Sequence, residues 1–209
     1  MRLTLSTQTP LASGGEKEVY QHLEVEKLLI KVWRPRYFER LKGQRAMFSP
    51  LRRLPKYTGC LKELSEHLYI RDWEEENRFV QNIVGIVDTD LGVGVVVEKV
   101  SRVNGQLAQS LNELLANGQY RPVHEKAMAE LLSWLRSTGL IIRDLNTRNL
   151  VWDELDNRFV IIDGLGGKAC FSFRSLCRWY NKRSNNKRAN KLLVRIERGK
   201  QKAQIMLAQ

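Results

Sequence analysis

The 209-residue sequence is poor in cysteine and contains no long apolar run. Its three cysteines form no C-x-x-C pair, so the sequence predicts neither a disulfide framework nor a zinc site. No apolar stretch approaches the roughly 18–20 residues that a membrane-spanning helix needs. The first ten residues are too polar for the apolar core of a signal peptide. We therefore expect a reduced, cytoplasmic protein.

Acidic residues are also scarce, because 23 Asp and Glu stand against 35 Lys and Arg, a formal net charge of +12. Residues 32–57 hold eight basic residues against one glutamate, a net +7. Residues 171–209 hold eleven basic residues against one glutamate, a net +10. These two blocks indicate an anionic partner, which is a nucleic acid, a phosphate ligand or an acidic membrane surface. The alternative is that they are solvated helix faces and loop.

The first hundred residues have the apolar pattern of strands with one helix among them. The expected strands are Leu3–Leu11, Val19–Leu23, Lys27–Trp33 and an antiparallel pair, Ile83–Val87 and Val93–Val100. Leucines at helical spacing predict a helix over about 60–72. Residues 34–57 contain three prolines and many arginines, a pattern typical of an irregular insertion.

The second half of the chain is richer in helix. Apolar residues on one face predict an amphipathic helix over 124–138. Three short apolar runs follow, at Leu140–Ile142, Asn149–Trp152 and Phe159–Ile162. After Gly167 the pattern predicts basic helix to the end of the chain.

Three polar residues follow one another at intervals that suit phosphate chemistry. Asp144 and Asn149 lie five residues apart in a loop between two short strands, and Asp163 follows at the end of the next strand. Phosphoryl transfer needs a group that orients the attacking hydroxyl and oxygen ligands for magnesium. These side chains can supply both, although the same residues would also suit turns that cap strands.

Arg143-Asp144-Leu145 with Asn149 resembles the catalytic loop of the protein-kinase superfamily, and Asp163 resembles the first residue of its metal-binding D-F-G element. The resemblance implies that Asp144 and Arg143 are catalytic residues. It implies that Asn149 and Asp163 bind Mg²⁺ and that ATP is the phosphate donor.

The same resemblance implies an α+β, two-lobed protein-kinase-like fold with a shortened C-lobe. The N-lobe would cover about 1–98 and the C-lobe about 101–209, with the nucleotide bound between them. The C-lobe is short because few residues follow the D-F-G-like element, and they contain no recognisable activation segment or A-P-E element.

The resemblance extends to the nucleotide-binding half of the chain. Gly14 and Val19 match the glycine-rich loop, while Ala12 and Lys17 stand where glycines are usual. Lys31 resembles the strand lysine that holds the α- and β-phosphates, and a lysine within an apolar strand needs a carboxylate partner. Glu63 is the expected partner, with Glu66 as the second choice. The alternative for Lys31 is an edge strand from which its ammonium reaches solvent.

Glu98 and Val100 resemble the hinge whose backbone binds adenine in the same superfamily. A narrower resemblance is to the bacterial YrbL family, the PhoP regulatory network proteins. It is carried by residues 5–14, by Tyr20 and by Ile30-Lys31-Val32, and it covers nearly the whole chain. The two basic blocks add a second expectation for location, peripheral binding at the inner membrane.

Two departures from the kinase pattern bear on activity. Ile142 replaces the histidine before Arg143, and Asn146 replaces the lysine that neutralises the transferred phosphate in serine/threonine kinases. Positive charge would then have to come from elsewhere, with Arg148 and Lys168 as candidates.

Three functions stay open at this point. The first is ATP-dependent phosphotransfer to a hydroxyl of an unidentified acceptor, which is a sugar, a lipid, a small molecule or a protein. The second is a nucleotide-binding pseudokinase or regulatory module in a bacterial stress or envelope circuit. The third is binding to an anionic surface through the basic blocks, with a membrane favoured over nucleic acid.

Overall fold

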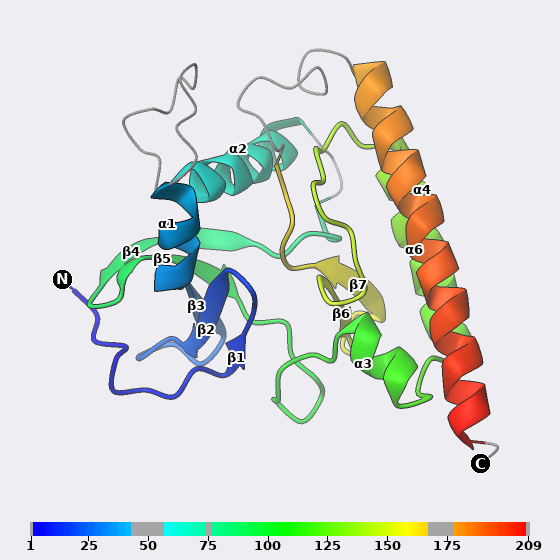
Figure 1. The fold of residues 1–209 in the computed structure, drawn as a ribbon, viewed down its shortest axis with the longest axis horizontal. Coiled ribbons are helices and arrows are strands. Elements are labelled where there is room, and N and C mark those ends of the chain that lie inside the picture. Colours follow the sequence, from blue (N-terminus) through cyan, green and yellow to red (C-terminus); the bar gives the residue numbers. More distant parts are fainter. Residues whose placement is uncertain (1, 43–56, 74–76, 167–177, 208–209) are drawn as a thin grey trace. The chain divides into compact units, whose positions relative to one another are not determined.

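The computed structural model describes residues 2–42, 57–73, 77–166 and 178–207, and it divides the chain into two units (Figure 1). The first unit consists of residues 1–64 and 82–99, and the second of residues 65–81 and 100–209. Residues 65–81 lie in the stretch that was expected to belong to the N-lobe. They belong to the second unit because Ile70 and Phe79 are buried in its core.

The first unit is built on a five-stranded sheet in which every neighbouring pair is antiparallel. The strands in spatial order are β1 (Ala12–Ser13), β2 (Lys17–Gln21), β3 (Leu28–Trp33), β5 (Gly92–Glu98) and β4 (Ile83–Thr89). The predicted strand at 27–33 and the predicted antiparallel pair are confirmed. Residues 14–17 form a tight turn between β1 and β2, called the glycine turn below, in which the Gly14 N–H donates to the Lys17 carbonyl at 2.9 Å.

The two faces of this sheet have different neighbours. One face buries a small apolar cluster that includes Leu3, Leu5 and Ile30. On the other face, Val95 and Cys60 line a common pocket, so the start of α2 (Thr58–Trp73) packs there. Helix α2 confirms the predicted helix over 60–72.

Two predictions for the first unit are wrong. Leu3–Leu11 is not a strand, because the Asp90 carboxylate accepts hydrogen bonds from the Leu5 and Ser6 amides at 2.7 and 3.1 Å. Leu3 makes a single bridge to Thr89, and the Leu11 amide donates to the Val19 carbonyl at 2.8 Å. The stretch expected to be irregular begins with a helix, α1 (Pro35–Lys42). Proline at the first position of a helix is favoured because its missing N–H is not needed there. Residues 43–56 lie outside the described residues.

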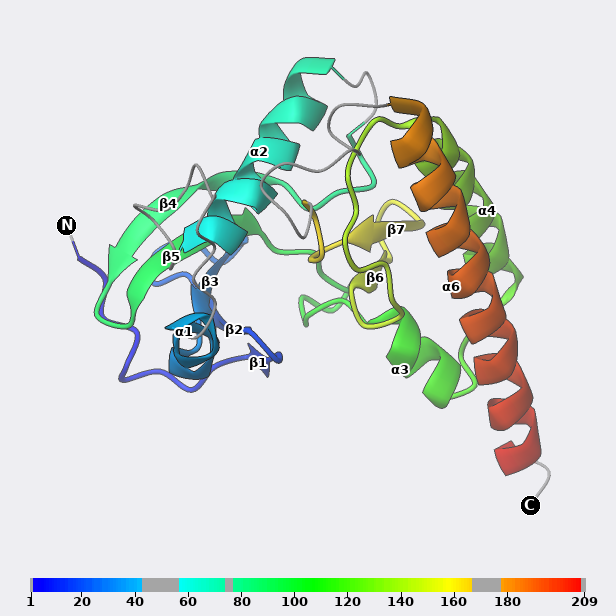
Figure 2. The same cartoon turned by 45° about the horizontal axis from the view of Figure 1, so that its top comes forward.

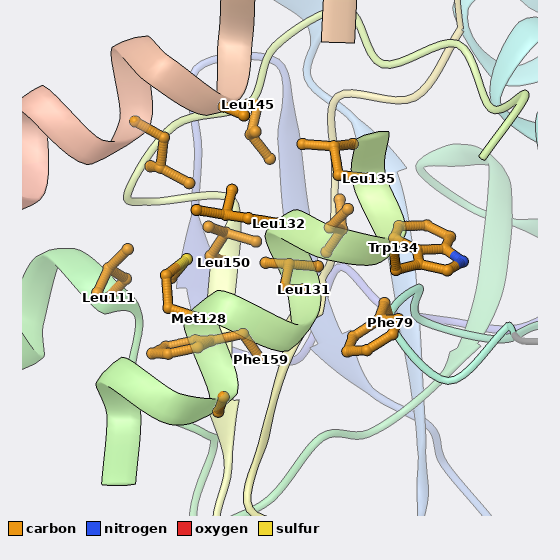
Figure 3. Close-up of a cluster of buried hydrophobic side chains, with 14 of the residues drawn as sticks. Phe79, Leu111, Met128, Leu131, Leu132, Trp134, Leu135, Leu145, Leu150 and Phe159 are labelled. Atoms are coloured by element: carbon orange, nitrogen blue, oxygen red, sulfur yellow. The ribbon is translucent and has the colours of Figure 1, made fainter. Parts of the chain in front are cut away.

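The second unit combines helices with a short hairpin, β6 (Leu150–Asp153) and β7 (Arg158–Ile161). Helix α4 (Pro122–Ser137) confirms the predicted amphipathic helix, and it contacts both β7 and α6 (Arg178–Leu207). Figures 1 and 2 show α4 and α6 side by side. The large apolar core is drawn in Figure 3, where Trp134 of α4 packs on Phe79 with ring centroids 5.1 Å apart.

Helix α3 (Leu111–Ala116) was not predicted, although its start signal is in the sequence. Ser110 and Glu113 form a reciprocal capping box, in which each side chain accepts a hydrogen bond from the backbone of the other residue. The predicted basic C-terminal helix is confirmed over 178–207, while residues 167–177 lie outside the described residues. Within the described part of the chain, no helix is both long and apolar enough to cross a membrane.

Candidate active site

The loop between α4 and β6 holds the residues that resemble a kinase catalytic loop. The start of this loop is anchored by α6, because the Asn185 amide donates to the Leu140 carbonyl at 2.9 Å and both residues are buried. The Arg143 and Asp144 amides donate to the Gly164 carbonyl at 2.7 and 3.1 Å. The loop is therefore held at its start by α6 and in its middle by the segment that follows β7.

Asp144 is exposed to solvent, and its carboxylate is held by the residue that replaces the expected lysine. The Asn146 amide nitrogen donates to Asp144 Oδ2 at 2.8 Å. The Asn149 amide nitrogen donates to the Asp144 backbone carbonyl at 2.9 Å. These contacts use Asp144 Oδ2 and the Asn149 side-chain nitrogen, so that Asp144 Oδ1 could meet a hydroxyl and the Asn149 side-chain oxygen could bind a metal.

Gly164 brings the third polar residue, Asp163, beside this loop. Gly164 has φ +88°, and a Cβ at this position would lie 2.4 Å from the Asp144 carbonyl oxygen and 3.1 Å from Asn149 Nδ2. In addition, the Ile162 amide donates to the Asn149 carbonyl at 2.9 Å. The structure thus brings Asp144, Asn149 and Asp163 together within the second unit.

The donor set of this cluster suits magnesium. An amide oxygen from Asn149 and a carboxylate from Asp163 are hard oxygen ligands, and Mg²⁺ is usually held by only one or two protein groups together with phosphates and water. Among the described residues, no three His, Cys, Asp or Glu side chains gather as a dedicated metal site.

An arginine from α6 lies behind the loop, and sequence reasoning missed it. Arg188 Nε donates to the Arg143 carbonyl at 3.3 Å. Burial lowers the pKa of the Arg188 guanidinium, and the negative charge of Asp144 opposes that shift. Arg188 therefore adds positive charge near the loop. Of the two residues proposed for this role, Arg148 is exposed and Lys168 lies outside the described residues.

In the first unit, the glycine turn is held against the end of β3, and Val19 and Lys31 lie opposite each other on β2 and β3. Arg34 Nη1 donates to the Gly14 carbonyl at 3.1 Å and so ties the turn to the end of β3. Val19 lies directly opposite Lys31 in the β2–β3 register. Lys31 is 6% exposed, so it is a buried lysine within an apolar strand, as the sequence indicates.

Glu63 forms an ion pair with Lys17. Lys17 Nζ lies 2.5 Å from Glu63 Oε2, and the two side chains are 9% and 12% exposed. Lys17 Nζ also lies 5.0 Å from the centroid of the Trp33 ring, which is a cation–π distance. The pairing of Lys31 with Glu63 stays a prediction.

The two hinge residues fall at the boundary between the units. Glu98 ends β5 in the first unit, where its amide donates to the Asn82 carbonyl at 3.0 Å and its carboxylate accepts from the Asn82 side chain at 3.0 Å. Val100 belongs to the second unit, and its carbonyl accepts from the Ala108 amide at 3.0 Å. Their adenine-binding role stays a prediction.

The fold is an α+β fold of the protein-kinase class, with an antiparallel sheet in one unit and the loop of Asp144 and Asn149 in the other. The crystal structure of Rad53 1-466 in complex with AMP-PNP, a protein kinase, is similar over 90% of this chain, with a TM-score of 0.56 and 13% sequence identity. The alignment covers 46% of the Rad53 chain, so this protein spans about half the length of that relative. A family model for the PhoP regulatory network protein YrbL matches residues 3–197, and the chain belongs to that family. No curated protein matches it.

Proposed function

We propose that this protein is an ATP-dependent phosphotransferase that transfers the γ-phosphoryl group to a hydroxyl. The observation that carries the proposal is the cluster of Asp144, Asn149 and Asp163, which Gly164 holds together by a contact too close for any other residue. The bound nucleotide of the Rad53 structure, AMP-PNP, supports nucleotide binding by a chain of similar fold.

The roles follow from the chemistry of each group. Asp144 accepts a hydrogen bond from the acceptor hydroxyl and orients its oxygen toward the phosphorus, while Asn146 fixes the other carboxylate oxygen. Asn149 and Asp163 would hold Mg²⁺, which neutralises negative charge on the phosphates when bound. Arg188 supplies a fixed positive charge behind the loop.

Replacing the Asp144 carboxylate tests the proposal directly. We expect Asp144→Asn to lower Mg²⁺-dependent conversion of ATP to ADP, with water as acceptor, by about 100-fold or more, because the amide cannot accept the proton. The melting temperature should stay unchanged because the side chain is exposed. Asp72→Asn is the matched control, an exposed aspartate on α2 in the same unit, and it should keep wild-type turnover. Equal turnover in wild type and Asp144→Asn would refute the role of Asp144.

A second candidate function is a nucleotide-binding regulatory module without turnover. The observation that favours it is the Asn146 side chain, which contacts the Asp144 carboxylate where the kinase pattern has a phosphate-neutralising lysine. The same assay separates the two functions when it is combined with thermal melting. A rise in melting temperature with Mg·ATP but no turnover supports the regulatory module, whereas measurable turnover excludes it.

A further inference from the structure

Two buried lysines share one face of the first unit's sheet. In the β2–β3 register Lys17 lies opposite Trp33, and Val19 lies opposite Lys31. Directly opposed residues of antiparallel strands point to the same side, and alternate residues of one strand do so as well. Lys17 is therefore a diagonal neighbour of Lys31, roughly 7–8 Å away at the backbone.

Burial makes the position of Lys17 costly. The residue is 8% exposed, and an ammonium removed from water needs a compensating charge. The Glu63 carboxylate from α2 supplies that charge at 2.5 Å, and the Trp33 ring lies beside the ammonium. A glycine or another small residue at position 17 would avoid this desolvation cost. A simple turn therefore does not require the ion pair of Lys17 and Glu63.

The chain places this lysine at the end of the glycine turn. Lys17 closes the turn through its carbonyl, which accepts from the Gly14 amide at 2.9 Å. Arg34 braces both sides of Lys17, because it donates to the Gly14 carbonyl at 3.1 Å and pairs with the Glu18 carboxylate at 3.3 Å. The Lys17 ammonium thus comes from the turn itself and lies on the face that also bears Lys31.

We propose that Lys17 binds the phosphates of the nucleotide and that Glu63 positions it. The sequence pattern assigns this task to Lys31 on β3, whereas the geometry points to the lysine that replaces a glycine at the start of β2. A lysine ammonium is a common phosphate ligand because it offers a compact positive charge and several donors. This inference rests on the nucleotide binding in the proposed function, and it concerns which residue contacts the phosphates.

The first test measures the affinities of Mg·ATP and of adenosine by calorimetry. We expect Lys17→Met to weaken ATP binding by about tenfold or more and to leave adenosine binding unchanged, because only the phosphates lose a charged partner. Glu63→Gln should also weaken ATP binding and leave adenosine binding unchanged. Lys27→Met, an exposed lysine between β2 and β3, is the matched control and should bind both ligands as wild type does. A purely structural role would instead weaken both ligands together.

A second measurement uses the wild-type protein, so it does not depend on whether a variant folds. An ATP derivative with an acyl group on its terminal phosphate reacts with a lysine amine held against the phosphates. The amine nitrogen attacks the carbonyl carbon, an amide bond forms, the bond to the phosphate oxygen breaks, and ATP leaves while the amine proton goes to solvent. Mass spectrometry then identifies the acylated lysine, and we expect Lys17.

Each outcome is decisive. Acylation of Lys31 without Lys17, or wild-type ATP affinity in Lys17→Met, overturns the inference and leaves the proposed function intact. ATP binding by the wild-type protein without acylation of either lysine also overturns it. Failure of the wild-type protein to bind Mg·ATP overturns the proposed function itself, and the role of Lys17 falls with it.

Discussion

Gly164 occupies a position that no other residue can fill without moving the loop of Asp144 and Asn149. Its φ of +88° lies in a region that side chains rarely adopt, and a Cβ would lie 2.4 Å from the Asp144 carbonyl oxygen. Two independent constraints therefore require glycine after Asp163: the backbone conformation and the close approach of the Asp144 carbonyl. At the scale of single residues, this glycine determines the spacing of the site.

We expect Gly164→Ala to lower ATP turnover by about 100-fold or more, since a displacement of about 1 Å in a positioned group has that effect. The backbone conformation alone should cost about 1–3 kcal/mol of the free energy of unfolding, measured by chemical denaturation. Gly105→Ala is the matched control, because Gly105 has φ +81° and no atom lies within 4 Å of the position that its Cβ would take. It should lose comparable stability from strain and keep its turnover. Equal losses of turnover in both variants would contradict the steric argument.

How far the site can be predicted from the sequence depends on the distance along the chain between its residues. Asp144, Asn149 and Asp163 follow one another closely, so their spacing alone indicates a common site. Lys17, which pairs with Glu63 of α2, lies 46 residues away on β2, and this pairing depends on which face of the sheet each side chain takes. Arg188 approaches the loop from 45 residues away on a helix whose register the basic pattern does not reveal.

The elements follow the same rule. Strand β3, from its continuous apolar run, and helix α4, from its apolar face, were predictable from their own residues. Residues 3–11 alternate like a strand, yet the Asp90 carboxylate, 85 residues away from Leu5, takes the amides that a sheet would need. A distant side chain therefore decided the structure of this segment.

The start of α4 depends on an uncharged histidine. His124 is buried, and its Nδ1 accepts a hydrogen bond from the Arg121 amide at 2.8 Å, which caps the helix. The Trp152 ring lies 4.4 Å from the imidazole at its edge. Burial lowers the pKa of His124, and the positive charge of Arg121 acts in the same direction. A protonated imidazole could not accept this hydrogen bond, so protonation disrupts the cap.

The lowered pKa of His124 sets the direction of a pH effect. Below about pH 6.5, the ordinary pKa of histidine, the unfolded chain binds a proton that the folded chain does not, so stability falls with falling pH. We expect the melting temperature to drop between pH 7.5 and pH 5.5, and the drop to be smaller in His124→Gln, whose side chain caps without titrating. His22→Gln, at a partly exposed position in the first unit, is the control and should keep the wild-type drop. An unchanged pH dependence in His124→Gln would contradict this account.

At the scale of the whole molecule, the net charge of +12 is concentrated in residues 32–57 and 171–209, and of the second block Arg188 reaches the candidate site. Helix α6 turns its buried side toward the second unit's core with Ala189, Leu192 and Ile196. Its outer side carries exposed basic residues together with exposed apolar ones: Arg183, Lys187, Lys191 and Arg198, with Trp179, Tyr180, Val194 and Ile205. Mixed cationic and aromatic side chains suit an anionic lipid surface, where Trp and Tyr lie at the headgroup level.

We propose that this outer side of α6 binds anionic membranes, and we expect the protein to cosediment with phosphatidylglycerol vesicles at low salt and to be released as salt rises. Lys187→Glu with Lys191→Glu should weaken vesicle binding by about tenfold or more, since each lysine near the surface contributes about 1 kcal/mol. Lys126→Glu with Arg136→Glu changes the net charge equally on the exposed side of α4, and it should keep most of the binding. Equal loss in both variants would mean that net charge alone attracts the protein. A competition experiment adds a short single-stranded oligonucleotide at a phosphate concentration equal to that of the vesicles. Displacement of the protein from the vesicles would favour nucleic acid as the partner. A polynucleotide needs only the basic residues, whereas a membrane also uses the exposed Trp179.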